Sequence, residues 1–146
     1  MRPALNLAYD PALPRAYCWA IHYLHGHAGI TARLEELQAE GLGLSVISLA
    51  ELCEGISYSQ DPQGNEQALR NFLAGIQVVG VDEETCQILG RERGRLRAAG
   101  ELVGDFDLLI GASALRHNLT LLTNNRRHFE RMKGCVWYSC NMPFPC

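Results

Sequence analysis

Oxygen-bearing side chains occur in this sequence at points where a predicted strand ends or a predicted helix begins. They are Glu51, Asp105, Asp107, Thr123, Asn124 and Asn125. In an open parallel sheet, the carboxyl ends of the strands meet at one edge, where ligands collect. Carboxylate, amide and water oxygens are the hard ligands that suit Mg²⁺ or Mn²⁺. The pattern therefore predicts an acidic, oxygen-rich cluster that binds a divalent cation.

Three of these residues also fit ordinary structural roles, and the sequence leaves both interpretations open. Glu51 completes an S-x-x-E pattern that begins at Ser48, in which it would cap the start of a helix. Asp105 fits an N-cap, and Asn125 fits a turn. Asp107 differs, because an apolar run follows it and a carboxylate beside apolar neighbours needs a partner.

Basic side chains follow the last of these segments. Arg126, Arg127 and His128 form a small basic patch, which predicts contacts with the phosphates of a polyanion. A second group of histidines lies within residues 22–27. No carboxylate accompanies that group, so surface histidines are a better interpretation there than a metal site.

A sheet and its helices must bring these residues together, and the sequence predicts both. From about residue 30 onward, short apolar runs alternate with segments of helical period, which is typical of a parallel sheet covered by helices. The predicted strands are residues 42–47, 76–81, 119–122 and 135–138, with a strand-like segment at 5–9. The predicted helices are residues 31–40, 48–58, 62–74, 82–99, 105–118 and 126–132. The predicted architecture is a three-layer α/β/α sandwich with a mainly parallel sheet.

Individual residues indicate where several helices begin and end. Asp61 and Asp82 are predicted N-caps, because each precedes a helical segment and can accept a hydrogen bond from its first turn. Asn118 is placed to end its helix in a left-handed conformation.

Length and composition fit one ordinary domain spanning residues 1–146. The chain is 47% hydrophobic and 20% charged, which excludes a disordered protein. Its net charge of -3 gives no overall electrostatic attraction for nucleic acid, so a polyanion would have to meet a local basic patch.

The sequence also predicts the cellular location and the state of the cysteines. No stretch of about 18 apolar residues occurs, and prolines interrupt the first segment. Neither a membrane span nor a signal peptide is expected, so the predicted location is the cytoplasm. The 6 cysteines contain no C-x-x-C pair and suit no common zinc site, so all are predicted to be free thiols.

Two blocks of sequence and the arginine-rich helix between them resemble a known family. The blocks are LGLSVISLAELCEGI at 42–56 and GDFDLLIGASALRHNLTLLTNNRRHFERM at 104–132. Over roughly residues 21–134 the chain resembles the PIN-domain ribonucleases of the VapC toxin family, and both ends diverge. The resemblance implies a PIN-like fold and an endoribonuclease that uses Mg²⁺ or Mn²⁺. It also implies a VapB-like antitoxin partner and a homodimer.

The resemblance assigns roles to individual residues. Glu51 matches the acid of the family's S-x-x-E-L segment, Asp107 matches the acid before an L-I-A-A-like helix, and Asn125 falls on the fourth position of the site. The implied catalytic residues are Glu51, Asp107 and Asn125. The implied metal ligands are Asp107, Glu51 and Asp105. The implied RNA contacts are Thr123, Arg126, Arg127 and His128.

One position departs from the family pattern. The family's first strand ends in an L-D-T-N-like motif, and continuing the match backwards places Ala16, Tyr17 and Cys18 there. Asp10, after the strand-like segment at 5–9, is the alternative acid if the intervening residues form a loop. Its structural interpretation is a turn residue before Pro11.

Three functions follow from these observations. The first is a metal-dependent ribonuclease toxin. The second is a degenerate member of the family that binds an antitoxin but cleaves nothing, because a metal carboxylate is missing. The third is a ligand-binding module unrelated to RNA, and the absence of a glycine-rich phosphate loop from the sequence disfavours it.

Overall fold

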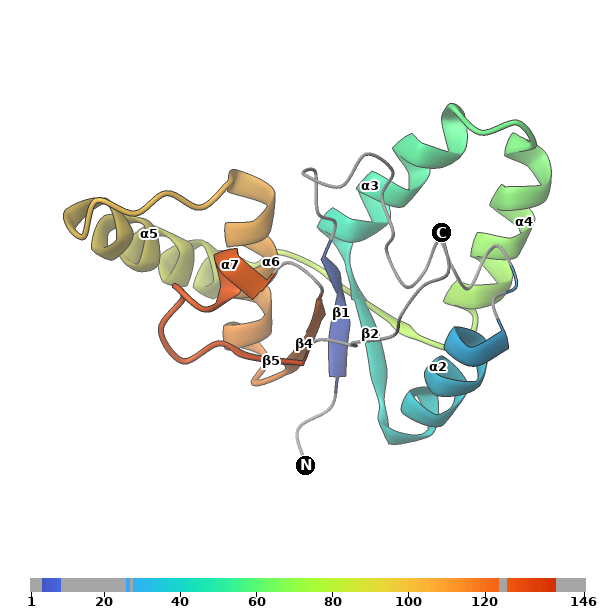
Figure 1. The fold of residues 1–146 in the computed structure, drawn as a ribbon, viewed down its shortest axis with the longest axis horizontal. Helices are drawn as coiled ribbons and strands as arrows, with labels where there is room; N and C mark the ends of the chain where they lie inside the picture. Colours follow the sequence, from blue (N-terminus) through green and yellow to red (C-terminus); the bar gives the residue numbers. More distant parts are fainter. Residues whose placement is uncertain (1–3, 9–25, 27, 124–125, 139–146) are drawn as a thin grey trace.

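The computed structural model describes residues 4–8, 26, 28–123 and 126–138 of the chain (Figure 1). Within these ranges the protein forms a parallel sheet of five strands in the order β3-β2-β1-β4-β5. The strands are β1 (Ala4–Ala8), β2 (Leu42–Ser45), β3 (Gln77–Val79), β4 (Thr120–Thr123) and β5 (Val136–Tyr138). The helices are α2 (Ala28–Glu40), α3 (Val46–Ser57), α4 (Pro62–Leu73), α5 (Glu83–Ala98), α6 (Asp105–Arg116) and α7 (Arg126–Phe129).

The helices lie on two sides of the central strand β1. Figure 1 shows α5, α6 and α7 on one side and α2, α3 and α4 on the other. Helix α3 packs on β1, β2 and β3, whereas α6 packs on β1 and β4. Helix α5 packs on α6, and α4 packs on α3. The predicted three-layer α/β/α architecture with a parallel sheet is confirmed.

An apolar core joins α5, α6, β4 and α7. Its buried members are Leu96, Leu108, Ile110, Leu121, Phe129 and Met132. Because these side chains come from elements far apart in sequence, their burial fixes α6 and α7 against each other and against β4.

The start of α3 differs from the prediction. The helix was expected to begin at Ser48, with Glu51 in the capping box. Instead β2 ends at Ser45, whose Oγ accepts a hydrogen bond of 3.1 Å from the Ser48 N–H. Ser45 is therefore the N-cap, and the residues expected to end the strand form the first turn of the helix. Glu51 lies in the second turn and is not part of the cap, so its capping-box interpretation was wrong.

The other predicted helix ends are mostly confirmed. Asp61 accepts a hydrogen bond from the Gly64 N–H at 3.0 Å, and Asp82 accepts one from the Thr85 N–H at 2.8 Å. Asn118 follows α6 with a positive φ of 53°. Asp105 is not an N-cap, because Gly104 occupies that position without a side-chain hydrogen bond and Asp105 is already helical.

The central strand comes from the beginning of the chain. The strand-like segment at 5–9 is observed as β1, and Ala8 at its end is paired with Thr123 of β4. The register that placed Ala16 at the end of this strand is therefore not the one the fold adopts. Asp10, Ala16, Tyr17 and Cys18 lie outside the described residues.

Two further expectations concern the described part of the chain. Its cysteines Cys53, Cys86 and Cys135 are free, as predicted. The remaining cysteines, Cys18, Cys140 and Cys146, lie outside the described residues. No described helix is long and apolar enough to cross a membrane.

Candidate metal-binding site

Glu51 has a partly buried carboxylate, and one of its two oxygens has no hydrogen-bond partner in the described part of the chain. Helix α3 follows β2 directly, and α3 also packs against α6. Among the described residues, one buried side-chain oxygen or nitrogen atom has no hydrogen-bond partner, and it is Oε2 of Glu51. Burial raises the pKa of Glu51 to about 7, and the negative charges of Asp107 and then of Glu54 add to this effect. A buried, unpartnered oxygen of this kind favours the binding of a cation or a proton.

Asp107 supplies the second carboxylate. It lies in the first turn of α6, and the residue is only 7% exposed. Its Oδ2 is in hydrogen-bond contact with Nδ1 of His128 in α7. Asp107 is close enough to Glu51 for its charge to disfavour ionisation of Glu51. A cation held by both carboxylates would remove this repulsion, so the pair fits a divalent metal.

The described residues supply only part of a metal site. Within them, no group of three or more His, Cys, Asp or Glu side chains could hold a metal ion. Mg²⁺ keeps several waters and needs only one or two protein carboxylates, so Glu51 and Asp107 suffice in number. Asn125, the third predicted catalytic residue, lies outside the described residues, as does Asp10.

The structure gives Asp105 and Thr123 surroundings that the sequence did not suggest. The Asp105 side chain is 79% exposed and forms an ion pair with Arg93 of α5. Its charge is thus compensated by arginine, whereas the side chain of Asp107 contacts a histidine. Thr123 was expected after a strand, but it is the last residue of β4 and is only 1% exposed. Such burial leaves its side chain little surface for contact with a substrate.

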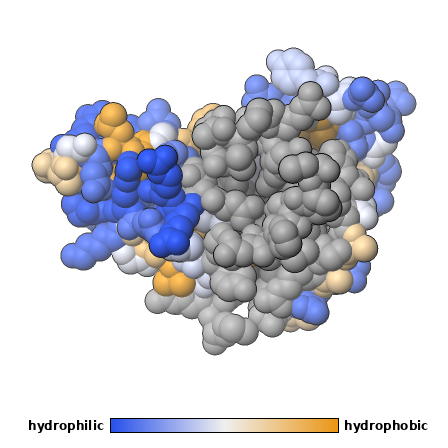
Figure 2. All heavy atoms as spheres, in the orientation of Figure 1, coloured by the Kyte–Doolittle hydropathy of each residue, from blue (hydrophilic) through white to orange (hydrophobic). Residues whose placement is uncertain are grey.

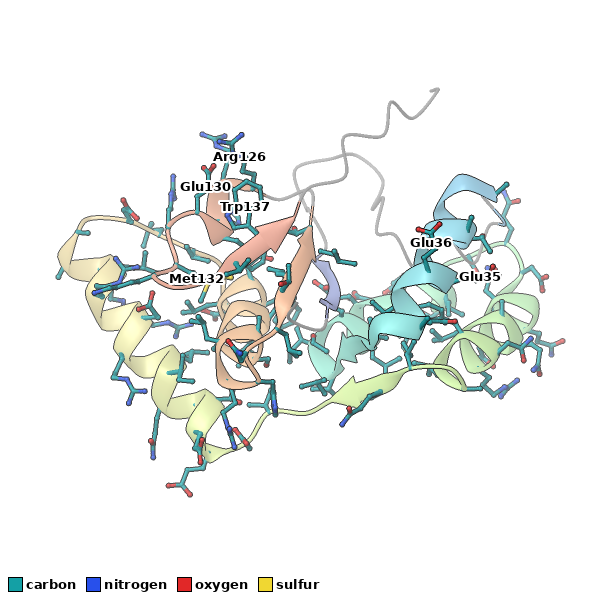
Figure 3. All side chains as sticks on the ribbon, turned by 90° about the horizontal axis from the view of Figure 1, so that it is seen from below. Glu35, Glu36, Arg126, Glu130, Met132 and Trp137 are labelled. Atoms are coloured by element: carbon teal, nitrogen blue, oxygen red, sulfur yellow. The ribbon has the colours of Figure 1, made fainter. Side chains whose placement is uncertain are left out.

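The two arginines of α7 have different surroundings. Arg126 is ion-paired with Glu130, and its guanidinium lies 5.3 Å from the ring centroid of Trp137 in β5 (Figure 3). Arg127 is exposed and makes no ion pair or hydrogen bond within the described ranges. Figure 2 shows strongly hydrophilic side chains gathered over α7. Arg127 is therefore the arginine of this pair that is available to a phosphate.

Sequence reasoning did not identify the two residues that interact with Arg126. The spacing of four between Arg126 and Glu130 on a helix is a signal that could have indicated their ion pair. The contact with Trp137 depends on the pairing of β4 with β5, which brings that residue beside α7. The acids Glu35 and Glu36 of α2 lie on the other side of the molecule from Arg126, Glu130 and Trp137 (Figure 3).

The raised pKa of Glu51 predicts a pH-dependent stability for the metal-free protein. Between its ordinary value of 4.5 and about 7, the folded state keeps a proton that the unfolded state has lost. Stability therefore falls as pH rises through this window, and the loss is complete above it. The full displacement corresponds to about 3 kcal/mol at 1.36 kcal/mol per pKa unit. Solvent screening of the partly exposed group lowers the expected loss to about 1–2 kcal/mol.

Glu51→Gln removes this titration. Urea denaturation in a chelator should show the variant to be more stable than the wild type by about 1–2 kcal/mol at pH 8, relative to their difference at pH 4.5. Glu66→Gln, which removes an exposed carboxylate of α4, serves as the control. A Glu51→Gln difference that is the same at both pH values would contradict the assigned environment of Glu51.

The sequence of the chain is similar to a known protein family and to several of its members. The PIN-domain family model matches residues 19–134. Ribonuclease VapC2 of Rickettsia felis is 33% identical over 95 residues, which are 65% of this chain and 71% of that protein. The tRNA(fMet)-specific endonuclease VapC of Shigella flexneri is 35% identical over 91 residues, or 62% of this chain and 69% of that protein.

Solved structures show the same arrangement of elements. The VapBC2 complex of Rickettsia felis, bound to a DNA fragment from its promoter, has a TM-score of 0.77 and 28% identity. That comparison covers 84% of this chain and 94% of the other. The DNA-bound VapBC complex of Salmonella typhimurium has a TM-score of 0.74 and 27% identity, covering 82% and 90% of the two chains.

Proposed function

The chain belongs to the PIN-domain family, and on this premise we propose that it is a metal-dependent endoribonuclease, the toxin of a type II toxin–antitoxin pair. The observation that supports this proposal most is the buried, unpartnered Oε2 of Glu51 beside the charge of Asp107. The similar VapC proteins are named as ribonucleases or as a tRNA endonuclease, which supports RNA as the substrate class.

Glu51 and Asp107 are the residues that would hold the cofactor. PIN-domain VapC nucleases are generally metal-dependent. The all-oxygen character of the two carboxylates favours Mg²⁺ or Mn²⁺ over softer metals. When bound, the ion would activate a water for attack on the phosphodiester and stabilise the negative charge that develops there. Asn125 stays a predicted member of this site, and Asp10, which follows β1 in sequence, stays the alternative for the missing acid.

The protein's own side chains would place the RNA. Arg127 precedes His128 in α7 and makes no ion pair or hydrogen bond within the residues that the structure describes, so it would be free to contact a phosphate of the RNA. Arg126 would act indirectly, because its guanidinium already interacts with Glu130 and Trp137. These contacts fix the backbone of a substrate and carry no sequence information, so they predict RNA binding without a choice of sequence.

A protein partner forms the second half of the proposal. The similar solved structures are complexes of a VapC-type toxin with a VapB-type antitoxin, which supports a VapB-like antitoxin for this chain. Self-association as a homodimer stays a prediction, and the mass of the purified protein in solution would test it.

The nuclease activity can be tested with purified protein and a labelled single-stranded RNA. We expect cleavage with Mg²⁺ or Mn²⁺, its loss in EDTA, and its return when the metal is restored. Bound metal should also raise the unfolding temperature, since a ligand of the folded state stabilises it. Binding of metal without any cleavage would contradict the proposed nuclease and favour a degenerate protein that only binds an antitoxin.

A further inference from the structure

His128 reaches the candidate site from a different element than the two carboxylates. It belongs to α7, whereas Asp107 belongs to α6, and 21 residues separate them in sequence. Its Nδ1 contacts Oδ2 of Asp107, and its side chain is 31% exposed. The sequence had suggested a contact with RNA phosphate for this histidine. The observed contact is with a carboxylate of the protein instead.

We infer that His128 is a positioning residue that fixes the orientation of the Asp107 carboxylate for cation binding. The inference rests on the proposed function in one respect, which is that Asp107 is a metal ligand. Carboxylates that bind metals are commonly oriented by hydrogen bonds from residues that do not touch the metal. His128 is placed to donate such a bond through Nδ1.

Packing of α7 against α6 fixes the position of His128 relative to Asp107. Phe129, the next residue, is fully buried, and Met132 is 2% exposed in the same core. Both lie against Gly111 of α6, where an added Cβ would meet the end of Met132 and come within 3.5 Å of Phe129. The helix with Asp107 and the helix with His128 are therefore held together by close contact at a glycine.

The chemistry of the partner distinguishes Asp107 from its neighbour Asp105. Asp105 is paired with Arg93, whose permanent positive charge compensates the carboxylate. Asp107 instead contacts a ring nitrogen of His128, and an imidazole N–H can orient a carboxylate oxygen through a hydrogen bond. The two acids in one helical turn thus have partners of different chemistry, arginine for Asp105 and histidine for Asp107.

Two replacements of His128 separate a positioning role from simple packing. His128→Asn keeps an amide N–H where Nδ1 lies, whereas His128→Leu keeps most of the volume and removes the donor. Mn²⁺ affinity, measured by electron paramagnetic resonance of the free ion, should fall about 10–100-fold in the leucine variant. It should stay within a few-fold of the wild type in the asparagine variant. RNA cleavage should follow the same order through kcat, with little change in KM.

Arg127→Leu is the matched control on the same helix. It removes an exposed cation that makes no ion pair or hydrogen bond within the described residues, so the KM for RNA should rise while the Mn²⁺ affinity stays within a few-fold of the wild type. Thermal unfolding of each variant in EDTA reports whether the fold is retained. The wild type alone offers a further check, because nitrogen-15 spectra of the metal-free protein should show the proton of His128 on Nδ1.

The outcomes distinguish this inference from the proposed function. Wild-type Mn²⁺ affinity in His128→Leu, or a change confined to KM for RNA, would overturn the positioning role. A proton on Nε2 with a bare Nδ1 would do the same without any variant. A wild type that binds no Mn²⁺ and cleaves no RNA would instead overturn the proposed function, and this inference with it.

Discussion

Asp107→Asn should lower metal-dependent RNA cleavage by at least about 100-fold, because a displaced or absent metal ligand misplaces the attacking water. Asparagine has nearly the size of aspartate but lacks its charge, so the change acts on the cation more than on the packing of α6. The negative charge of Asp107 raises the pKa of Glu51 in the metal-free protein. Its removal therefore lowers the pKa of Glu51 and makes the ionised form of Glu51 less unfavourable. The variant should therefore be at least as stable as the wild type at pH 8 in EDTA.

Asp105→Asn provides the matched control for this experiment. It makes the same chemical change two residues earlier, on an exposed side chain that is paired with Arg93. Exposed ion pairs contribute roughly 0–1 kcal/mol to the free energy of unfolding, so the variant should keep its fold. We expect its rate of RNA cleavage to lie within a few-fold of that of the wild type. Steady-state cleavage at saturating Mg²⁺ gives the comparison. Equal losses in the two variants would show that the structure does not distinguish the two acids as we describe.

Phe129→Ala should lower the free energy of unfolding by about 3–5 kcal/mol, the range typical of a buried phenylalanine replaced by alanine. Phe129 is fully buried in the core shared by α5, α6, β4 and α7. A natural domain has a stability of about 5–15 kcal/mol, so this change would remove a large share of it. Urea denaturation of the metal-free protein measures the effect.

Phe106→Ala is the control for Phe129→Ala. Phe106 is 54% exposed at the start of α6, so its removal should change the free energy of unfolding by no more than about 0.5 kcal/mol. Similar effects in the two variants would mean that α7 is not held in the core as the fold indicates.

The order of elements and the parallel sheet could be predicted because they depend on local patterns. The caps at Asp61 and Asp82 and the left-handed Asn118 were likewise found from residues close to each helix end. The start of α3 was misplaced because an apolar run fits the end of a strand as well as the first turn of a helix. Ser45 and Ser48 both qualified as caps, and the hydrogen bond to the Ser45 side chain decides between them.

The site was only partly accessible to sequence reasoning. The sequence predicts that Glu51 and Asp107 lie near each other, since both were assigned to one edge of a parallel sheet, and in the structure the charge of Asp107 acts on Glu51. The partners of the acids were not expected, because Arg93 lies 12 residues from Asp105 and His128 lies 21 residues from Asp107. Such contacts depend on how α5 and α7 pack against α6. They therefore give Asp105 and Asp107 different surroundings, although the two residues are neighbours on one helix.

The central claim is that Glu51 and Asp107 share one divalent cation. Crystals soaked in Mn²⁺ test it directly through the anomalous scattering of the metal. We predict a peak at about 2.1 Å from a carboxylate oxygen of Asp107 and close enough to Glu51 for direct or water-mediated contact. A peak only at the other acidic group, Asp82 to Glu84 at the start of α5, or no peak beside Asp107, would contradict the claim.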